Sequence, residues 1–337
     1  MHAALLRFAD GGALTLTVAP EQTVLDAAMA ADAPLRYDCA AGACGSCVVH
    51  LRQGRTECDA AAPSPLSPAE AADGLRATCM TRLLSDAVFD LPYPLTPTPS
   101  PAARLSARVE SVGRAAATVH QLVLQLDDPE AFRFQAGQYM RLRPPGARVA
   151  RAYSMASAPD SSGRLEFLIR HVPGGVMSDW LAERAQVGER LTLHGPLGGF
   201  AFDARAARHV FLAGGTGLAP ALSILREASV RDGGAGLGSA LLCFGCTTAE
   251  DLFYEAEIHA LAAATPGLEA RVAVLQGGSE RGVRAGTALS LLSPADLAPG
   301  AAYYLCGPPP MIDASRAWLT AHGVAPGAIR SERYIPA

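Results

Sequence analysis

Hydrophobic and polar residues alternate in short runs along much of the first 90 residues, as they do in strands with one buried face. Alternation in residues 3–8 and 13–18, with two glycines between the runs, predicts a β-hairpin. Residues 23–31 have helical spacing instead, and Ser-Pro-Ala-Glu at 67–70 is a capping box that predicts a second, short helix. We therefore expect a small mixed sheet with a helix across it, the β-grasp arrangement.

A proline-rich segment follows at residues 91–103, with five prolines at nearly alternating positions. Such a segment does not fit inside a sheet or a helix, and it predicts an extended, polyproline-like linker. On this basis we place the first domain at residues 1–92, the linker at 93–103, and two further domains at 104–205 and 206–337.

After the linker the hydrophobic pattern changes twice. Short runs separated by turn signals predict an antiparallel β-barrel, with strands at 105–112, 119–126, 139–142, 152–156 and 165–170, then a helix at 177–184. From residue 209 onward strands alternate with helices, which predicts a doubly wound α/β domain with a parallel sheet. Its strands are expected at 209–213, 240–244, 270–275 and 303–306, and its helices at 219–229, 254–264 and 310–322.

Composition and charge restrict the possible partners. No apolar run approaches the roughly 18 residues of a membrane span, and no signal peptide is visible, so we expect a soluble, cytoplasmic protein without a membrane partner. Residues 1–90 carry 11 acidic and 6 basic side chains, and the remainder carries 21 and 22. Nucleic acid is an unsuitable partner, because phosphate binding needs clustered positive charge. The acidic excess permits docking on a basic protein surface, although a solvated face is the simpler explanation.

Four cysteines carry the spacing C-x4-C-x2-C…C, which predicts a plant-type [2Fe–2S] centre: Cys39, Cys44, Cys47 and Cys79. The loop between the first three contains almost only Gly, Ala and Ser, so its backbone N–H groups can close over inorganic sulfides. Structural zinc is an alternative, but it usually takes paired short-spaced dyads, whereas 31 residues separate Cys47 from Cys79. Disulfides are another, and they need an oxidising compartment.

Two motifs in the barrel segment have features of a flavin site. Arg151-Ala-Tyr153-Ser154 offers a guanidinium for a pyrophosphate, a ring for an isoalloxazine face and a hydroxyl for flavin N5. Gly174-Gly175-Val-Met-Ser178 opens a predicted helix, where free N–H groups form an anion site. Each motif is weak alone, since strands often contain Arg-x-Tyr and two glycines can form an ordinary turn with a helix cap.

Two later motifs fit a nicotinamide nucleotide. Residues 213–220, Ala-Gly-Gly-Thr-Gly-Leu-Ala-Pro, join a predicted strand to a helix, where glycines allow close approach to a pyrophosphate. The G-x-G-x-x-G fingerprint is absent, and a structural turn is the alternative. Cys306 ends a strand at the carboxyl edge, where open α/β sheets bind ligands, although the prolines after it could simply terminate the strand. No Arg lies between Cys243 and Arg271, which favours NADH because a 2′-phosphate would need one nearby.

Taken in this order, the motifs resemble the ferredoxin–NADP reductase superfamily. The whole chain is similar to the one-chain reductases of bacterial aromatic-ring dioxygenases, of the benzoate and anthranilate 1,2-dioxygenase type. This resemblance implies electron transfer from NADH through FAD and a [2Fe–2S] cluster to a Rieske-type terminal oxygenase. A reductase for a diiron monooxygenase is the alternative among enzymes, and a non-catalytic ferredoxin is the alternative outside them.

The resemblance also implies the roles of individual residues. The four cysteines ligate the cluster, and FAD is held by Arg151, Tyr153, Ser154, Gly175, Met177 and Ser178. The nicotinamide nucleotide is held by Gly214, Gly215, Thr216, Gly217, Pro220, Cys306, Gly307 and Pro308. Ser154, Cys306 and Glu332 are the expected catalytic residues around the hydride-transfer site. Tyr334 would stack on the isoalloxazine and move aside for nicotinamide, with a frayed terminus as the alternative.

Overall fold

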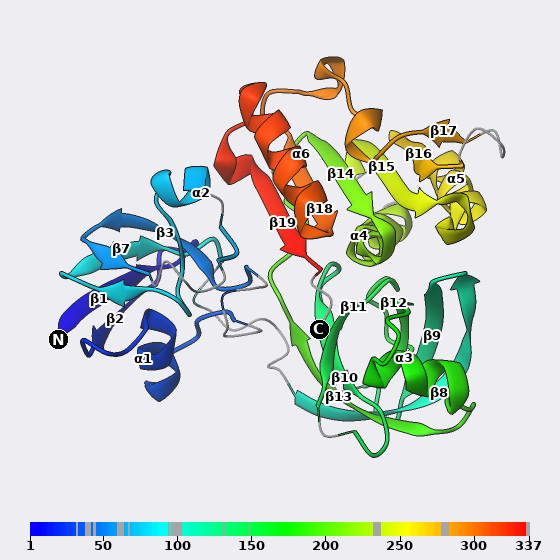
Figure 1. The fold of residues 1–337 in the computed structure, drawn as a ribbon, viewed down its shortest axis with the longest axis horizontal. Helices are drawn as coiled ribbons and strands as arrows, with labels where there is room; N and C mark the ends of the chain where they lie inside the picture. Colours follow the sequence, from blue (N-terminus) through cyan, green and yellow to red (C-terminus); the bar gives the residue numbers. More distant parts are fainter. Residues whose placement is uncertain are drawn as a thin grey trace. The chain divides into compact units, whose positions relative to one another are not determined.

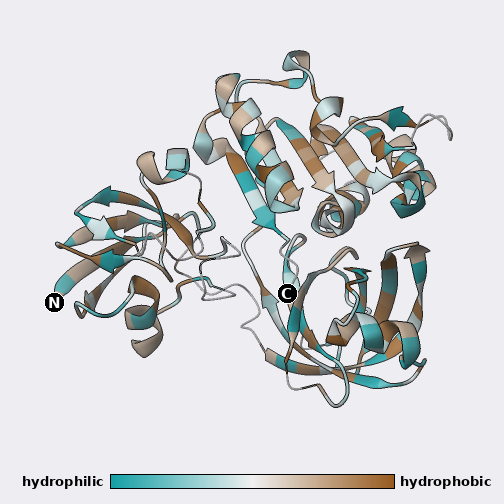
Figure 2. Cartoon of the chain, viewed as in Figure 1, coloured by the Kyte–Doolittle hydropathy of each residue, from teal (hydrophilic) through white to brown (hydrophobic). Residues whose placement is uncertain are grey.

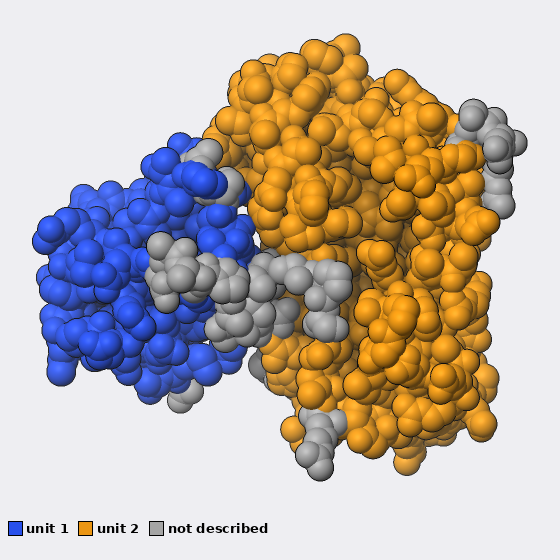
Figure 3. Space-filling view, in the orientation of Figure 1, with its two compact units in different colours: residues 1–99 blue, residues 100–337 orange. Residues whose placement is uncertain are grey.

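The computed structural model describes residues 1–31, 33–37, 42, 45–58, 64–66, 68–93, 95, 103–130, 132–147, 149–231, 237–277 and 283–334. The chain divides into two compact units, Met1–Pro99 and Ser100–Ala337 (Figure 3). The sequence predicted three domains and a linker, with boundaries at residues 93, 104 and 206. The division into two units does not test these boundaries, which stay predictions.

The first unit contains a five-stranded mixed sheet in the order β2-β1-β7-β3-β5. Its strands are β1 (His2–Arg7), β2 (Ala13–Val18), β3 (Val48–Gln53), β5 (Leu75–Ala77) and β7 (Ala87–Asp90), and β4 (Thr56–Glu57) pairs with β6 (Arg82–Leu83) apart from it. The hairpin of β1 and β2 is antiparallel as predicted, whereas β1 and β7 are parallel. The mixed sheet and the helices below confirm the β-grasp prediction.

Two helices accompany this sheet at the predicted places. Helix α1 (Val24–Ala30) begins after Thr23, whose side chain forms a capping box with Asp26. Helix α2 (Pro68–Ala72) has proline at its first position, while the Ser67 expected to cap it lies outside the described residues. The buried side of α1 packs with apolar residues of β1, β2 and β7 in one core, and that core also includes Cys47 and Cys79.

The second unit begins with six strands that form antiparallel pairs in the order β11-β10-β13-β8-β9-β12. They are β8 (Ala103–Ala116), β9 (Val119–Leu126), β10 (Tyr139–Arg143), β11 (Arg151–Ser154), β12 (Arg164–Arg170) and β13 (Arg190–Leu197). A bridge between Met155 and Phe167 joins the two outer strands, so the sheet closes into the predicted barrel. Helix α3 (Val176–Glu183) follows β12 as predicted, whereas β13 had not been predicted.

The rest of the second unit is a six-stranded parallel sheet in the order β17-β16-β15-β14-β18-β19. The strands are β14 (Arg208–Gly214), β15 (Ser239–Thr248), β16 (Leu268–Gln276), β17 (Arg284–Ala285), β18 (Ala302–Gly307) and β19 (Ile329–Arg333). The helices are α4 (Leu218–Val230), α5 (Glu255–Ala264) and α6 (Pro309–Ala321), and 3₁₀ turns include η1 (Gly215–Gly217), η3 (Ala249–Asp251) and η6 (Pro294–Asp296). The edge strands β17 and β19 had not been predicted.

Helices cover both faces of this parallel sheet (Figure 1). On β14, Phe211 and Ala213 pack in the core that contains α4 and α5, whereas Val210 and Leu212 pack in the core that contains α6. Successive side chains of a strand point to opposite faces, so a strand covered on both sides carries a continuous apolar run, as residues 210–213 of β14 do; Figure 2 colours the chain by hydropathy. This confirms the doubly wound prediction. None of the helices in the described ranges has the length and apolar character needed to cross a membrane.

Candidate active site

Two of the four predicted cluster ligands face one another in the core of the first unit. The Sγ atoms of Cys47 and Cys79 lie 3.2 Å apart, which is too far for the roughly 2.05 Å bond of a disulfide. The hydrogen bond between these thiols lowers the pKa of Cys47 to about 6, which favours the thiolate form that binds metals. Cys39 and Cys44 lie outside the described residues. The described half of the ligand set therefore fits a thiolate-bound iron centre.

The cysteine loop needs glycine for its backbone conformation. Gly42 and Gly45 have φ values of 70° and 80°, in the left-handed region that favours glycine. A Cβ atom on Gly45 would meet only Pro65, at 3.8 Å, so conformation and not crowding requires glycine there. This agrees with the expectation that the loop presents its backbone.

The flavin motif on β11 places a charged and an aromatic side chain on one side of the strand. Arg151 and Tyr153 are two residues apart and half-buried, while Ser154 between strand and loop is buried. Among the described residues the Arg151 guanidinium makes no hydrogen bond or ion pair, so it can hold an anion, while its backbone pairs with β10. The strand therefore fits the group that the motif was expected to bind, although the individual roles stay predictions.

The N-terminus of α3 offers backbone N–H donors, whereas the side chains of Met177 and Ser178 already have partners within the protein. The Ser178 hydroxyl accepts a hydrogen bond from Val172 N–H (2.9 Å), and the Met177 side chain is buried in the barrel core. The first N–H groups of a helix have no partner within it, and Gly175 supplies no side-chain cap. A Cβ on Gly175 would lie 2.9 Å from the Val172 carbonyl oxygen. Any phosphate bound here would thus meet N–H groups of Met177 and Ser178 rather than their side chains.

The glycines between β14 and α4 serve two different purposes. A Cβ on Gly217 would lie 2.3 Å from the carbonyl oxygen of Cys306, and one on Gly214 would lie 2.6 Å from Sδ of Met311. Gly217 is needed because the loop packs directly on the backbone at the end of β18, whereas the flexible Met311 side chain on α6 could move away from a Cβ on Gly214. Gly215 has φ of 54° with nothing within 4 Å of a Cβ, so it alone of the three leaves open space for a ligand. The sequence interpretation had assigned all of these glycines to pyrophosphate approach.

Thr216 and Pro220 complete this loop. Thr216 is buried, and Pro220 is the third residue of α4, where the missing proline N–H leaves no intrahelical hydrogen bond unmade. On the neighbouring strand, Pro308 precedes α6 as its N-cap and Gly307 has φ of 151°. The two nucleotide motifs, far apart in sequence, therefore lie together at the carboxyl edge of the sheet.

Residues from the barrel and the C-terminal strand meet in one hydrogen-bonded group. The Tyr334 hydroxyl donates to Ser154 Oγ (2.7 Å), and Ser154 Oγ donates to Glu332 Oε1 (3.1 Å). Cys306 lies opposite Glu332 on the neighbouring strand, and its pKa is raised well above its usual value mainly by burial. Cys306 is therefore a neutral thiol at neutral pH, suited to packing and not to nucleophilic attack.

The C-terminal segment is ordered by strand pairing as far as Tyr334. Strand β19 pairs in parallel with β18, with Glu332 opposite Cys306, and the Tyr334 N–H donates to the Gly307 carbonyl (2.9 Å). A frayed end is thus wrong for residues 329–334. All four residues expected around the hydride-transfer site come together, while their catalytic roles stay predictions.

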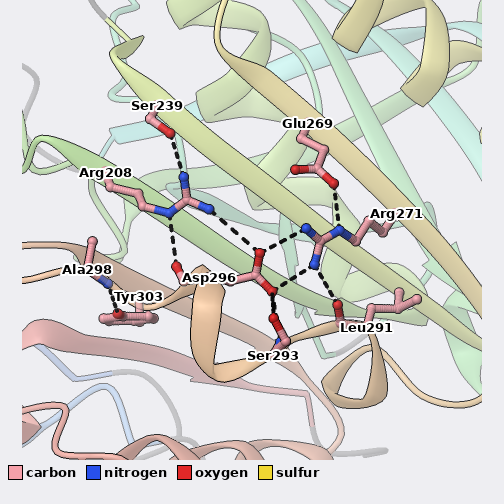
Figure 4. Close-up of polar contacts among 9 residues, drawn as sticks. All are labelled: Arg208, Ser239, Glu269, Arg271, Leu291, Ser293, Asp296, Ala298 and Tyr303. Carbon is pink, nitrogen blue, oxygen red and sulfur yellow. Dashed lines mark hydrogen bonds and ion pairs between the residues drawn. The ribbon is translucent and has the colours of Figure 1, made fainter.

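The arginine considered for a 2′-phosphate is committed elsewhere (Figure 4). Arg271 binds both carboxylate oxygens of Asp296 at 2.8 Å, with further bonds to Glu269 and the Leu291 carbonyl. Arg208 at the start of β14 also contacts Asp296, through Nε to its carbonyl oxygen (3.0 Å). This network lies at the amino ends of the strands, whereas the nucleotide loop follows their carboxyl ends. Arg271 therefore cannot serve a bound nucleotide.

The sequence interpretation missed a buried polar cluster between the barrel and the nucleotide sheet. Glu166 on β12 is 6% exposed and forms an ion pair with Arg226 on α4 (2.6 Å). Two signals were available in the sequence: Glu166 interrupts the apolar run of residues 165–169, and Arg226 continues the helical row of Leu218 and Leu222 at intervals of four.

Comparison with known proteins assigns all three parts. Family models match residues 8–84 (2Fe-2S iron-sulfur cluster binding domain), 106–202 (oxidoreductase FAD-binding domain) and 211–317 (oxidoreductase NAD-binding domain). The chain is 31% identical over 337 residues to the 2-halobenzoate 1,2-dioxygenase electron transfer component of Burkholderia cepacia, covering 100% of this chain and 98% of that protein. It is 36% identical over 269 residues, 78% of each chain, to methane monooxygenase component C of Methylosinus trichosporium. The crystal structure of an Amycolatopsis cytochrome P450 reductase matches with a TM-score of 0.71 and 29% identity, covering 100% of this chain and 99% of that one.

Proposed function

We propose that this chain, which belongs to the family of one-chain iron–sulfur flavoprotein reductases that includes dioxygenase electron transfer components, passes electrons from NADH to the terminal oxygenase of an aromatic-ring-hydroxylating dioxygenase system. The observation that carries the proposal is the similarity over the full length of both chains to a dioxygenase component, with all three cofactor domains in one polypeptide. The terminal oxygenase would be of the Rieske type and the protein cytoplasmic.

The cofactors supply the redox chemistry. FAD, when bound, takes up two electrons as a hydride and releases them singly, and a [2Fe–2S] cluster carries single electrons. The protein contributes binding and orientation. Cys39, Cys44, Cys47 and Cys79 would hold the cluster, and Arg151, Tyr153 and the backbone N–H groups at the start of α3 would hold FAD.

The group of Ser154, Glu332, Tyr334 and Cys306 would form the hydride-transfer site. The Ser154 hydroxyl accepts a hydrogen bond from Tyr334 and donates its one proton to Glu332, and it would turn this O–H toward flavin N5 when FAD is bound. The buried, neutral Cys306 would pack against nicotinamide. No residue needs to act as a general base, because hydride transfer from a reduced nicotinamide moves no separate proton.

The second candidate is a reductase for a diiron monooxygenase. It is supported by the 36% identity to methane monooxygenase component C. We favour the dioxygenase partner because the dioxygenase component matches 100% of this chain, whereas the methane monooxygenase component matches 78% of it. A non-catalytic ferredoxin is disfavoured by the matching FAD and NAD domains.

The test is anaerobic reduction of the purified protein. We expect bound FAD and a [2Fe–2S] spectrum, both bleached by NADH, and a higher kcat/KM for NADH than for NADPH. A protein that binds zinc and no flavin, or whose loaded cluster stays oxidised with excess NADH, would contradict the proposal. Electron transfer to a purified Rieske oxygenase, measured beside transfer to a diiron hydroxylase, then separates the two candidate partners.

A further inference from the structure

Four polar side chains, of which Glu166 is buried and the other three are partly buried, connect the barrel to the nucleotide sheet within the second unit. Glu166 on β12 accepts hydrogen bonds at Oε1 from Gln121 on β9 (2.8 Å) and from the hydroxyl of Tyr254. Its other oxygen, Oε2, lies 2.6 Å from Nη1 of Arg226 on α4. Two members of the cluster belong to barrel strands, and two belong to the helical side of the nucleotide sheet. The cluster therefore ties the two halves of the unit together.

Arg226 also binds the backbone next to the flavin motif. The same Nη1 atom donates to the carbonyl oxygen of Ala156 (2.9 Å), two residues after Ser154. One turn earlier on α4, the Ser223 hydroxyl donates to the carbonyl oxygen of Ser157 (2.7 Å). Helix α4 is thus held by two side chains against the segment that leaves β11.

Helix α4 transmits this contact to the nucleotide loop. Its first residue is Leu218, directly after η1, and Arg226 lies eight residues later, about 12 Å along the axis at 1.5 Å per residue. A helix of two turns moves as a rigid body over this distance. A shift at Arg226 would therefore shift the loop of Gly214–Gly217 relative to Ser154.

The backbone of Tyr254 indicates that this contact is maintained against strain. Tyr254 has φ of 59° and ψ of 19°, and it is the non-glycine residue with positive φ among the residues that the structure describes. Such a conformation is unfavourable for a residue with a side chain, because Cβ comes too close to the following carbonyl oxygen. It directs the Tyr254 hydroxyl to Glu166, and strained conformations persist only where surrounding contacts hold them.

Glu166 carries its charge at neutral pH. Burial by itself raises the pKa of Glu166, but the charge of Arg226 and the hydrogen bonds from Tyr254 and Gln121 outweigh burial and lower the pKa below its usual value. The ion pair with Arg226 therefore exists under the conditions in which the protein works.

We propose that Glu166 and Arg226 are positioning residues for hydride transfer, which hold α4 and its nucleotide loop in register with the strand end that carries Ser154. Neither belongs to the residues expected to touch a cofactor, so they act through α4 and residues 156–157. The inference rests on the proposed function, because it concerns the geometry of that reaction.

The test compares Arg226→Met, Arg226→Lys and Glu166→Gln with Arg231→Met as the matched control. Arg231 ends the same helix and pairs with Glu227 on the surface, with its side chain 61% exposed. In anaerobic stopped-flow mixing with NADH, we expect Arg226→Met to lower the limiting rate of flavin bleaching about ten- to hundredfold, as a misplacement of about 1 Å can do. The NADH concentration for half-maximal rate should change far less. Arg226→Lys should recover most of the rate, because one nitrogen makes both contacts.

Hydrogen exchange of the FAD-loaded protein without NADH gives an independent measurement. Amides of residues 154–157 and 218–226 should exchange faster in Arg226→Met and Glu166→Gln, and at the wild-type rate in Arg231→Met. A limiting rate within about twofold of wild type in both Glu166→Gln and Arg226→Met, or equal slowing by Arg231→Met, would overturn the proposal. If Arg226→Met does not fold, Glu166→Gln and Arg226→Lys decide. If NADH does not bleach the flavin of the wild-type protein, the proposed function is contradicted instead. Hydrogen exchange alone then decides whether Glu166 and Arg226 hold α4 against residues 156–157.

Discussion

Replacing Asp296 by asparagine tests how much the network at the amino ends of the parallel strands stabilises the second unit. The Asp296 side chain is 8% exposed. It accepts hydrogen bonds from both terminal nitrogens of Arg271 and from the hydroxyl and backbone N–H of Ser293. The Arg271 hydrogen bonds, against the opposing effect of burial, lower the pKa of Asp296 from 3.8 to about 2. The substitution removes the charge and keeps the size.

The expected loss follows from two estimates. The lowered pKa corresponds to about 2 kcal/mol of stability at neutral pH, since each pKa unit is worth about 1.4 kcal/mol. Breaking a buried pair costs about 3–5 kcal/mol in general. Arg271 keeps Glu269 and the Leu291 carbonyl in the variant, so we expect the lower end, about 3 kcal/mol.

Urea unfolding followed by tryptophan fluorescence measures this loss. Both tryptophans, Trp180 and Trp318, belong to the second unit, so the signal reports that unit alone. Glu269→Gln is the matched control, because Glu269 binds the same Arg271 but its side chain is 57% exposed. We expect the control to lose less than about 1 kcal/mol, as exposed pairs do.

Acidification provides a second check on Asp296→Asn. A carboxylate with a lowered pKa stabilises the folded state above its unfolded pKa of 3.8, and this contribution disappears as the pH falls through the folded value of about 2. The pH-dependent part of the difference from wild type should therefore fall to about half at pH 3. Equal destabilisation by Glu269→Gln, or a difference that does not shrink on acidification, would refute the reasoning.

The other predictions concern the cofactor sites. Cys79→Ser should abolish cluster-dependent reduction of a one-electron acceptor while NADH still reduces FAD, as absorbance shows; loss of both activities would mean that the two units do not work separately. Gly217→Ala should abolish NADH-dependent flavin reduction, because its Cβ would lie 2.3 Å from the Cys306 carbonyl oxygen. Gly327→Ala, with open space around its Cβ, is the control and should keep wild-type rates.

Elements with a strong local pattern could be predicted from the sequence, and elements defined by their neighbours could not. Alternation or helical spacing indicated the first hairpin and α1, because each buries one regular face. Strand β19 is Ile-Arg-Ser-Glu-Arg, with a single buried residue, and it exists because it pairs with β18. Strand β13 does alternate at Leu191 and Leu193, but Gly195-Pro196 interrupts the pattern, and the strand was missed.

The candidate site shows the same division. Its motifs are local, so their residue types could be recognised one at a time. The contact of Ser154 with Glu332 spans 178 positions, and only the family resemblance placed these residues together before the fold was known. The packing of Gly217 against Cys306 could not be predicted, because local sequence does not place that strand beside the loop, and the part of Gly217 in nucleotide binding stays a prediction.

Two chains of contacts, called routes below, connect the nucleotide loop with the barrel, and we expect them to behave differently during the proposed reaction. One runs through Gly307, whose carbonyl binds the Tyr334 N–H, and from the Tyr334 hydroxyl to Ser154. This route has to open if nicotinamide is to approach Ser154, because the Tyr334 hydroxyl occupies a position 2.7 Å from its Oγ. The other runs along α4 from the loop to Arg226 and the Ala156 carbonyl, and it contains no residue of the hydride-transfer site. The contact of Arg226 with Ala156 can persist if Tyr334 moves away from Ser154. We therefore expect Arg226 to keep the nucleotide loop in register with the barrel at the step in which the hydrogen bond between Tyr334 and Ser154 is lost.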